Sequence, residues 1–196
     1  MKKPDILAAL DPIMQAFENI GVPYYIGGSI ASSAFGIARA TLDVDLVADL
    51  TAHTVPTLMR MLKKGYYIDE EMILNAIDKH ASFNIIHLET MIKVDIFVPE
   101  DAPYQRAVFD RRRKDTLEEV EKANEYNLAS AEDVILNKLI WFDKGGRISK
   151  RQWRDVLGVL KVQSDALDKA YLLRWATELG VAELLKKALI NADIHQ

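Results

Sequence analysis

Residues 24–50 constrain the fold of this chain more than any other stretch, because an apolar run within them carries two carboxylates. Residues 42–48 have the length and composition of a strand, and they contain Asp43 and Asp45. Successive side chains of a strand alternate between its faces, so these aspartates are expected to share one face of a sheet. Two unpaired carboxylates side by side repel each other. A divalent cation removes that repulsion, and Mg²⁺ favours a few carboxylates together with substrate phosphates.

A glycine pair and a serine precede this run, directly after residues 24–26, which predict a short strand. Gly27 and Gly28 let the backbone approach a ligand without a Cβ in the way. Ser29 is expected to cap a helix over residues 30–37, whose N-terminal amides suit a phosphate. A phosphate-binding turn followed by a metal-binding carboxylate pair predicts a site for a nucleoside triphosphate.

This segment resembles the signature of the DNA polymerase β-like nucleotidyltransferase superfamily. The match consists of Gly28-Ser29, a spacer over residues 30–42 and the Asp-x-Asp of residues 43–45. The resemblance implies an α/β (α+β) fold, in which a mixed or antiparallel sheet flanked by helices is followed by a C-terminal helical bundle. It also implies a third carboxylate on a later strand.

The third carboxylate is expected in a hairpin, whose strands are predicted over residues 81–88 and 91–98 on either side of a Glu-Thr turn. Asp95 lies in the middle of the second of these apolar runs. Taken alone, such an aspartate is more often exposed or ion-paired than a metal ligand. With the superfamily pattern, the resemblance implies that Asp95 completes a metal-binding set with Asp43 and Asp45.

Residues 39–45, with the sequence R-A-T-L-D-V-D, are similar to one branch of the superfamily, which contains the abortive-infection (AbiEii-type) toxin nucleotidyltransferases. The resemblance to this branch draws attention to two further positions, Lys138 and Asp155. Ser130 is expected to cap a helix in which Lys138 is the only charge of an apolar run. Such a lysine usually extends to water, but the resemblance implies that Lys138 lies in the nucleotide site. Asp155 matches a motif of the next helix loosely, and for it ion pairing is an equal alternative.

The resemblance implies transfer of a nucleoside monophosphate from a nucleoside triphosphate to an acceptor hydroxyl, with release of pyrophosphate and with Mg²⁺ or Mn²⁺ as cofactor. Two alternatives remain open: a binding module of the same fold without turnover, and a kinase-like phosphotransferase. The catalytic set is Asp43, Asp45, Asp95 and Lys138, with the three aspartates as metal ligands. The nucleotide-binding set is Gly27, Gly28, Ser29, Arg39, Thr41, Lys138 and Asp155.

The rest of the chain predicts a nucleotidyltransferase core over residues 1–127 and a helical domain over residues 128–196. A basic cluster over residues 111–114 stands out in a chain of net charge −4. It is either a solvated or ion-paired face, or a contact for the triphosphate or an acceptor RNA. Trp141, Trp153 and Trp175 are expected to pack the helical domain. Further helices are predicted over residues 4–20, 54–64, 70–79, 150–163, 167–179 and 181–192, and Ser149 is expected to cap the helix over residues 150–163. Residues 66–68 are ambiguous, and residues 124–128 are expected to cross between the two parts.

The composition indicates in which cellular compartment this protein is expected to work. Cysteine is absent, which excludes disulfides and thiolate metal sites, and no stretch approaches the length of a membrane span. We therefore expect a cytoplasmic protein that does not bind membranes. Its expected partners are a nucleoside triphosphate and an acceptor that is a tRNA, a protein or a small molecule. A toxin–antitoxin role, with an antitoxin as partner, is a further expectation from the resemblance.

Overall fold

The computed structural model describes residues 4–41, 43–117 and 123–193, and it shows an α+β fold with a seven-stranded sheet. The chain divides into two compact units. The first, the sheet unit, consists of Met1–Ile26 and Thr41–Asn127. The second, the helical unit, consists of Gly27–Ala40 and Leu128–Gln196. The segment after the first strand therefore groups with the C-terminal helices and not with the strands that flank it in sequence.

The sheet is mixed, which agrees with the expected mixed or antiparallel sheet, and its strands lie in the order β3-β4-β5-β2-β1-β7-β6. Strand β2 pairs with β5 in parallel, whereas the pairs β1–β2, β3–β4 and β4–β5 are antiparallel. The bounds are β1 (Tyr24–Ile26), β2 (Val44–Ala48), β3 (Tyr66–Tyr67), β4 (Ser82–His87), β5 (Lys93–Phe97), β6 (Arg113–Thr116) and β7 (Glu125–Leu128).

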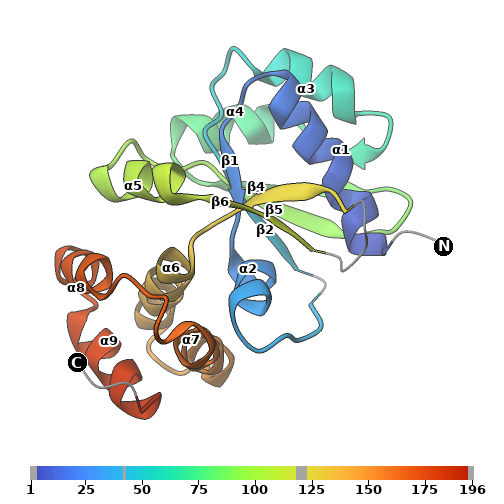
Figure 1. The fold of residues 1–196 in the computed structure, drawn as a ribbon. Helices are drawn as coiled ribbons and strands as arrows, with labels where there is room; N and C mark the ends of the chain where they lie inside the picture. Colours follow the sequence, from blue (N-terminus) through green and yellow to red (C-terminus); the bar gives the residue numbers. More distant parts are fainter. Residues whose placement is uncertain (1–3, 42, 118–122, 194–196) are drawn as a thin grey trace. The chain divides into compact units, whose positions relative to one another are not determined.

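The strands alternate between a buried face and a more open face, and this alternation positions the site. In β2, Val44, Leu46 and Ala48 are fully buried, whereas the residues between them are partly exposed. Figure 1 shows α1 (Asp5–Asn19), α3 (Val55–Leu62) and α4 (Glu70–Asp78) on one side of the sheet. Tyr66 of β3 donates a hydrogen bond to the carbonyl of Ala9 in α1.

One more helix of the sheet unit, α5 (Pro103–Arg111), packs near the first strand. The ring of Phe109 in α5 meets the ring of Tyr25 edge-on, with 5.1 Å between the ring centroids. Tyr25 pairs with Val47 in β2, and paired residues of neighbouring strands lie on the same face. Helix α5 therefore borders the more open face of the sheet.

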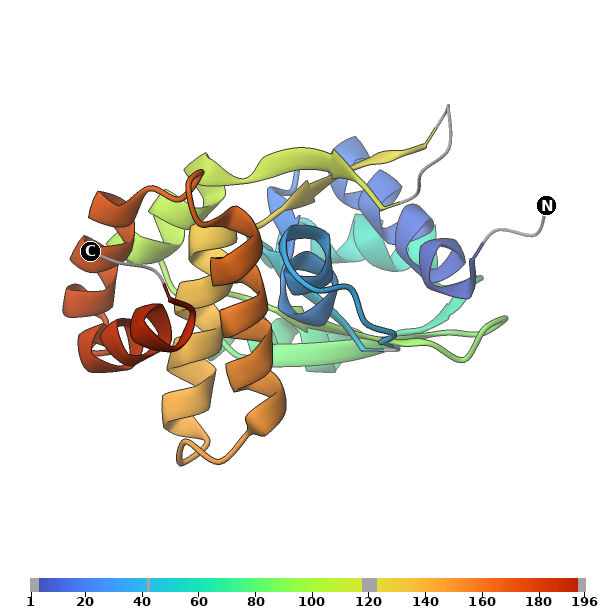
Figure 2. The ribbon, with the colours of Figure 1, turned by 60° about the horizontal axis from the view of Figure 1, so that its bottom comes forward.

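The helical unit is built around α6 and α7, which lie side by side in Figure 2. Helix α2 packs against both of them. The bounds are α2 (Gly28–Phe35), α6 (Ala131–Lys144), α7 (Lys150–Gln163), α8 (Lys169–Glu178) and α9 (Ala182–Asn191). Ser130 and Ser149 cap α6 and α7 as predicted, since each hydroxyl accepts a backbone N–H of the first turn. Trp175 is buried in this unit, as its expected packing requires, whereas Trp141 is 52% exposed.

Two local predictions were wrong. Helix α2 begins at Gly28, so Ser29 is its second residue and not its cap. Gly28 has a φ of 55°, a backbone conformation that glycine adopts without strain, and this starts the helix earlier. The strand predicted over residues 42–48 begins at Val44, so Asp43 precedes it, and residue 42 lies outside the described residues. Residues 124–128 cross between the two units as predicted, and within this stretch Glu125–Leu128 also forms strand β7 of the sheet, which was not predicted.

No helix among the described residues is long and apolar enough to cross a membrane.

Candidate active site

Asp45 and Asp95 lie directly opposite each other on the parallel strands β2 and β5. Opposed residues of neighbouring strands point to the same face of a sheet, and both side chains are partly exposed on the more open face. On the other side of Asp95, Asn84 of β4 occupies the opposing position. Two carboxylates and one amide therefore form a row across three strands.

Asp43 lies one residue before β2 and is exposed. Its backbone N–H donates to the hydroxyl of Thr41 at 3.2 Å, and that hydroxyl also lies 3.3 Å from the Asp43 carbonyl oxygen. Thr41, predicted to bind nucleotide, thus shapes the turn that leads into the first aspartate.

Lys93 supplies the positive charge that this set of carboxylates attracts. Its Nζ lies 2.7 Å from Oδ2 of Asp95, two residues further along β5. This hydrogen bond raises the pKa of Lys93, and the charges of Asp95, Asp43 and Asp45 add to the effect. The three predicted metal ligands therefore all stabilise one cation.

The chemistry of these donors fits a divalent cation, because carboxylate oxygens are the ligands that Mg²⁺ and Mn²⁺ accept. Asp45 and Asp95 are neighbours that already bind or attract a cation. As the side chains stand, the described part of the chain holds no group of three or more His, Cys, Asp or Glu residues that could hold a metal ion. The metal role of Asp43, Asp45 and Asp95 stays a prediction.

A second polar cluster lies within the helical unit and contains four of the predicted nucleotide-binding residues. Arg39 binds Asp155 of α7 through two hydrogen bonds, both 3.1 Å long, to the two carboxylate oxygens. Lys138 of α6 donates to Oδ2 of the same carboxylate at 2.8 Å. Arg39 also donates to the hydroxyl of Ser29 in α2. Lys138 is buried, so it does not extend to water but points into this cluster.

The electrostatics of this cluster leave a positive charge within it. Burial raises the pKa of Asp155, but the hydrogen bonds and charges of Arg39 and Lys138 outweigh burial and hold this pKa below its ordinary value. Asp155 is therefore ionised at neutral pH and offsets one of the two cations that share it. Ser29 and Lys138 are each 8% exposed. A partly desolvated cluster that retains positive charge suits a phosphate.

The structure also places residues that the sequence analysis missed. Arg151 of α7 lies four residues before Asp155, and its guanidinium is 3.4 Å from the Ser29 hydroxyl. The helical spacing to Asp155 was a usable signal for Arg151. Lys93 shares a face with Asp95 by strand alternation, which was also visible. Asn84 gave no signal, because only the register between β4 and β5 reveals it.

The remaining predicted residues are the glycine pair and the basic cluster. Gly27 and Gly28 form the start of α2. The basic cluster over residues 111–114 does not lie on one helix, since α5 ends at Arg111 and β6 begins at Arg113. Its expected contact with nucleic acid stays a prediction.

Comparison with known proteins places the fold. No family model matches the chain, and no curated protein matches it. Among solved structures, the chain is similar to the crystal structure of ANT(2'')-Ia in complex with adenylyl-2''-tobramycin, at TM-score 0.58 and 15% identity over 88% of this chain and 97% of that one. The solution structure of the antibiotic-resistance factor ANT(2'')-Ia gives TM-score 0.54 and 14% identity over 92% and 95%. The crystal structure of an antigenic nucleotidyltransferase-like protein from Paracoccidioides brasiliensis gives a TM-score of 0.52 and 16% identity, over 90% of this chain and 91% of that one.

The chain therefore shares the fold of these proteins, and the predicted α+β fold class is confirmed. At these identities the similarity concerns the fold, and function must be argued from the residues of this chain. The comparisons do not reach the AbiEii-type branch, which stays a prediction.

Proposed function

We propose that this protein is a metal-dependent nucleotidyltransferase that moves a nucleoside monophosphate from a nucleoside triphosphate to an acceptor hydroxyl. The observation that carries the proposal is the direct opposition of Asp45 and Asp95 on the open face of the sheet, with Lys93 held by the charges of all three aspartates. A sheet that only needed to be stable would not gather like charges in this way.

The proposed reaction breaks one bond and forms one. The acceptor oxygen bonds to the α-phosphorus, the bond from that phosphorus to the bridging oxygen breaks, and pyrophosphate leaves. Asp95 accepts the proton of the acceptor hydroxyl. Asp43, Asp45 and Asp95 would hold Mg²⁺ or Mn²⁺, which supplies positive charge to the attacking and leaving oxygens when bound.

The helical unit contributes the proposed contacts to phosphate. Arg39 and Lys138 share a single carboxylate, so together they retain charge that can neutralise the leaving pyrophosphate. The Ser29 hydroxyl and the backbone of Gly27 and Gly28 at the start of α2 would bind phosphate oxygens. Asp155 acts as a positioning residue, since it holds both cations in place.

The acceptor is proposed to be a small molecule bearing a hydroxyl. One structural neighbour was solved with adenylyl-2''-tobramycin, which supports testing this class first. A tRNA end and a protein hydroxyl are the other acceptors to test, and a toxin–antitoxin role is a further proposal from the sequence resemblance.

The test uses purified protein with each of the four α-labelled nucleoside triphosphates, Mg²⁺ or Mn²⁺, and separate pools of hydroxyl-bearing antibiotics, tRNA and protein. Mass spectrometry is expected to find one pool heavier by a nucleoside monophosphate, with pyrophosphate released in equal amount. Release of a nucleoside diphosphate instead would show the kinase-like alternative.

The matched variants are Asp45→Asn and Glu89→Gln. Asp45→Asn removes a charge of the proposed metal site without changing side-chain size, and it should lower transfer by about 10²-fold or more. Glu89→Gln makes the same change in the exposed turn of the hairpin and should leave transfer unchanged. Equal activity of both variants would refute the role of the aspartates.

A further inference from the structure

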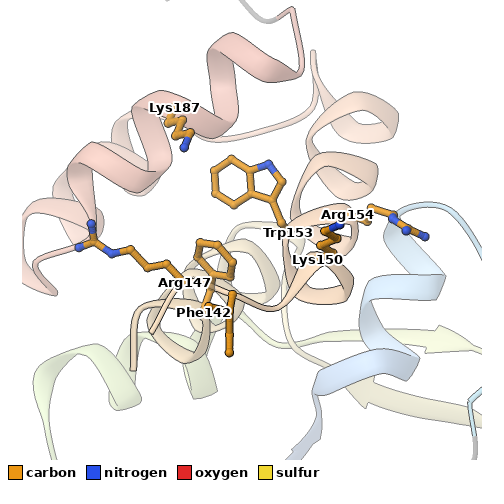
Figure 3. Close-up of a pocket in the computed structure, with 7 residues that line it drawn as sticks. Phe142, Arg147, Lys150, Trp153, Arg154 and Lys187 are labelled. Carbon is orange, nitrogen blue, oxygen red and sulfur yellow. The ribbon is translucent and has the colours of Figure 1, made fainter. Parts of the chain in front are cut away.

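A cavity of about 330 Å³ lies within the helical unit (Figure 3). Its apolar lining comes from Phe142 near the end of α6, Ile148 in the following loop and Trp153 in α7. The rings of Phe142 and Trp153 lie 5.2 Å apart between centroids, with 35° between their planes. Ile148 is 82% exposed. Small-molecule sites have volumes of about 300–1,000 Å³, so this cavity suits one small organic molecule.

The charges around the cavity are of one sign. Among the described lining residues four are basic and none is acidic: Arg147, Lys150, Arg154 and Lys187. Arg147 is partly neutralised by Asp143, whose Oδ1 lies 2.7 Å from its Nε. Lys187 of α9 extends its Nζ over the Trp153 ring, 5.7 Å from the centroid, as Figure 3 shows. In a chain of net charge −4, this concentration of cations favours an anion.

The cavity is distinct from the cluster around Asp155, although both use α7. Lys150, Trp153 and Arg154 line the cavity, whereas Arg151 and Asp155 carry the contacts to Ser29, Arg39 and Lys138. At 100° per residue, these two sets fall on different sides of the helix. The proposed transfer reaction leaves the cavity unused.

We propose that this cavity binds a small phosphate ester carrying one flat ring system, of the class of a nucleoside monophosphate. The ring stacks on the Trp153 indole in place of the Lys187 ammonium that now lies over it, and every nucleobase can present a π-face there. The phosphate pairs with Lys187 and Arg154, whose side chains are exposed and therefore able to turn toward it. The N-terminal end of α7, at which Lys150 lies, adds positive potential at the cavity.

The test is calorimetric titration of the full chain with adenosine 5′-monophosphate, adenosine and inorganic phosphate in the presence of EDTA, so that metal-dependent binding is suppressed. One molecule of the monophosphate should bind, about tenfold more tightly than adenosine or phosphate, since each fragment makes only part of the contacts. Failure of the monophosphate to bind would overturn the proposal.

Charge-matched variants locate the binding. Lys187→Gln and Arg154→Gln should each weaken it about tenfold, whereas Lys186→Gln, at the exposed position next to Lys187 that does not line the cavity, should have no effect. If Lys186→Gln and Lys187→Gln lowered the affinity for the monophosphate equally, the binding would reflect a general electrostatic attraction to positive charge, and the proposal would be overturned.

Ring-matched variants test stacking. Trp153→Leu should weaken binding, while Trp153→Phe keeps a flat ring and should retain most of it. Trp141→Phe, an exposed tryptophan that does not line the cavity, should bind as the unchanged protein does. Binding that survives Trp153→Leu would place the ligand elsewhere and refute the site. Because these experiments measure binding and not transfer, their outcome does not depend on whether the proposed reaction is correct.

Discussion

Asp155 shows at the scale of single residues how one buried carboxylate organises two cations. Its side chain is 8% exposed and holds Arg39 in a two-bond contact while it accepts a third bond from Lys138. Planar pairing of a guanidinium with a carboxylate fixes geometry as well as charge. Because these partners lie 116 and 17 residues away in the chain, the contact ties α7 to α6 and to the segment after α2.

Replacing this carboxylate should cost stability in a pH-dependent way. Asp155→Asn leaves both cations without their counter-charge and should lower the free energy of unfolding by about 1–3 kcal/mol at pH 7. The pKa of Asp155 is held below its ordinary value, so its contribution is complete above about pH 4, the pKa in the unfolded chain, and is lost as pH falls through the lower folded-state pKa. Urea unfolding of both proteins between pH 7 and pH 2.5 measures this difference.

The expected pattern is a constant gap between the two proteins above about pH 5 that narrows below about pH 4. Asp165→Asn, an exposed aspartate beyond the end of α7, provides the control and should show a small gap at every pH. If the difference in the free energy of unfolding widened toward low pH, the lowered pKa of Asp155 would be contradicted.

Lys93 makes a second prediction, because its ammonium occupies the charge environment that a metal would use. Lys93→Gln removes this competitor and should tighten Mn²⁺ binding about two- to fivefold, the effect of an exposed ion pair. Calorimetric titration with Mn²⁺ measures the change, and Lys64→Gln at an exposed position in another part of the sheet unit should not alter it. Identical affinities for Lys93→Gln and the unchanged protein would show that the lysine and the metal do not share the carboxylates.

At the scale of elements, the packing of α2 on α7 depends on a glycine. A Cβ at Gly36 would lie 2.8 Å from the backbone nitrogen of Val159, 2.9 Å from the carbonyl oxygen of Ser32 and 3.0 Å from the carbonyl carbon of Gly158. All three atoms belong to backbone, so no side-chain rotation relieves the overlap. The two segments can approach this closely only because position 36 has no side chain.

Gly36→Ala should therefore destabilise the protein by about 1–3 kcal/mol, the cost of overpacking a close contact. For a chain of this length, the melting temperature should fall by several degrees, since about 1 kcal/mol corresponds to about 2–4 °C. Scanning calorimetry measures it. Gly65→Ala is the control, because a Cβ there meets nothing within 4 Å. Similar melting temperatures for Gly36→Ala and the unchanged protein would mean that the helices can separate without cost.

The elements that the sequence predicted well are those whose signals are local. Helices α4, α6 and α7 follow from apolar spacing and from capping side chains such as Ser130 and Ser149. The start of α2 was missed because it depends on the conformation of Gly28, and strand β7 because four residues gain their structure only by joining the sheet.

The residues of the candidate site also differ in how far the sequence could predict them. The Asp-x-Asp motif and Asp95 could be found because carboxylates stand out in apolar strands, and the structure places Asp45 opposite Asp95. The partners of Asp155 could not be ranked from sequence, since ion pairing and ligand binding use the same residue types. Only the coordinates show that Arg39 and Lys138 share this carboxylate.

At the scale of the whole molecule, the chain enters the helical unit twice. Gly27–Ala40 leaves the sheet unit after β1 and joins the helices that begin more than 100 residues later, near residue 131. The apolar side of α2 is buried within that unit, including Ile30, Ala31 and Phe35. A break after residue 127, which looks like a domain boundary in the sequence, therefore removes the helices that α2 packs against.

Hydrogen exchange on a fragment of residues 1–127 tests this dependence with an internal control. Helix α1 packs on α3 within the sheet unit, so its amides should remain protected in the fragment. Helix α2 has only eight residues and loses its packing partners, and isolated helices shorter than about 12–15 residues are marginal in water. Its amides should exchange at nearly unfolded rates in the fragment and slowly in the full chain. Equal protection of α2 in both would mean that the sheet unit alone can fold this segment, and that Ser29 needs no support from the C-terminal helices.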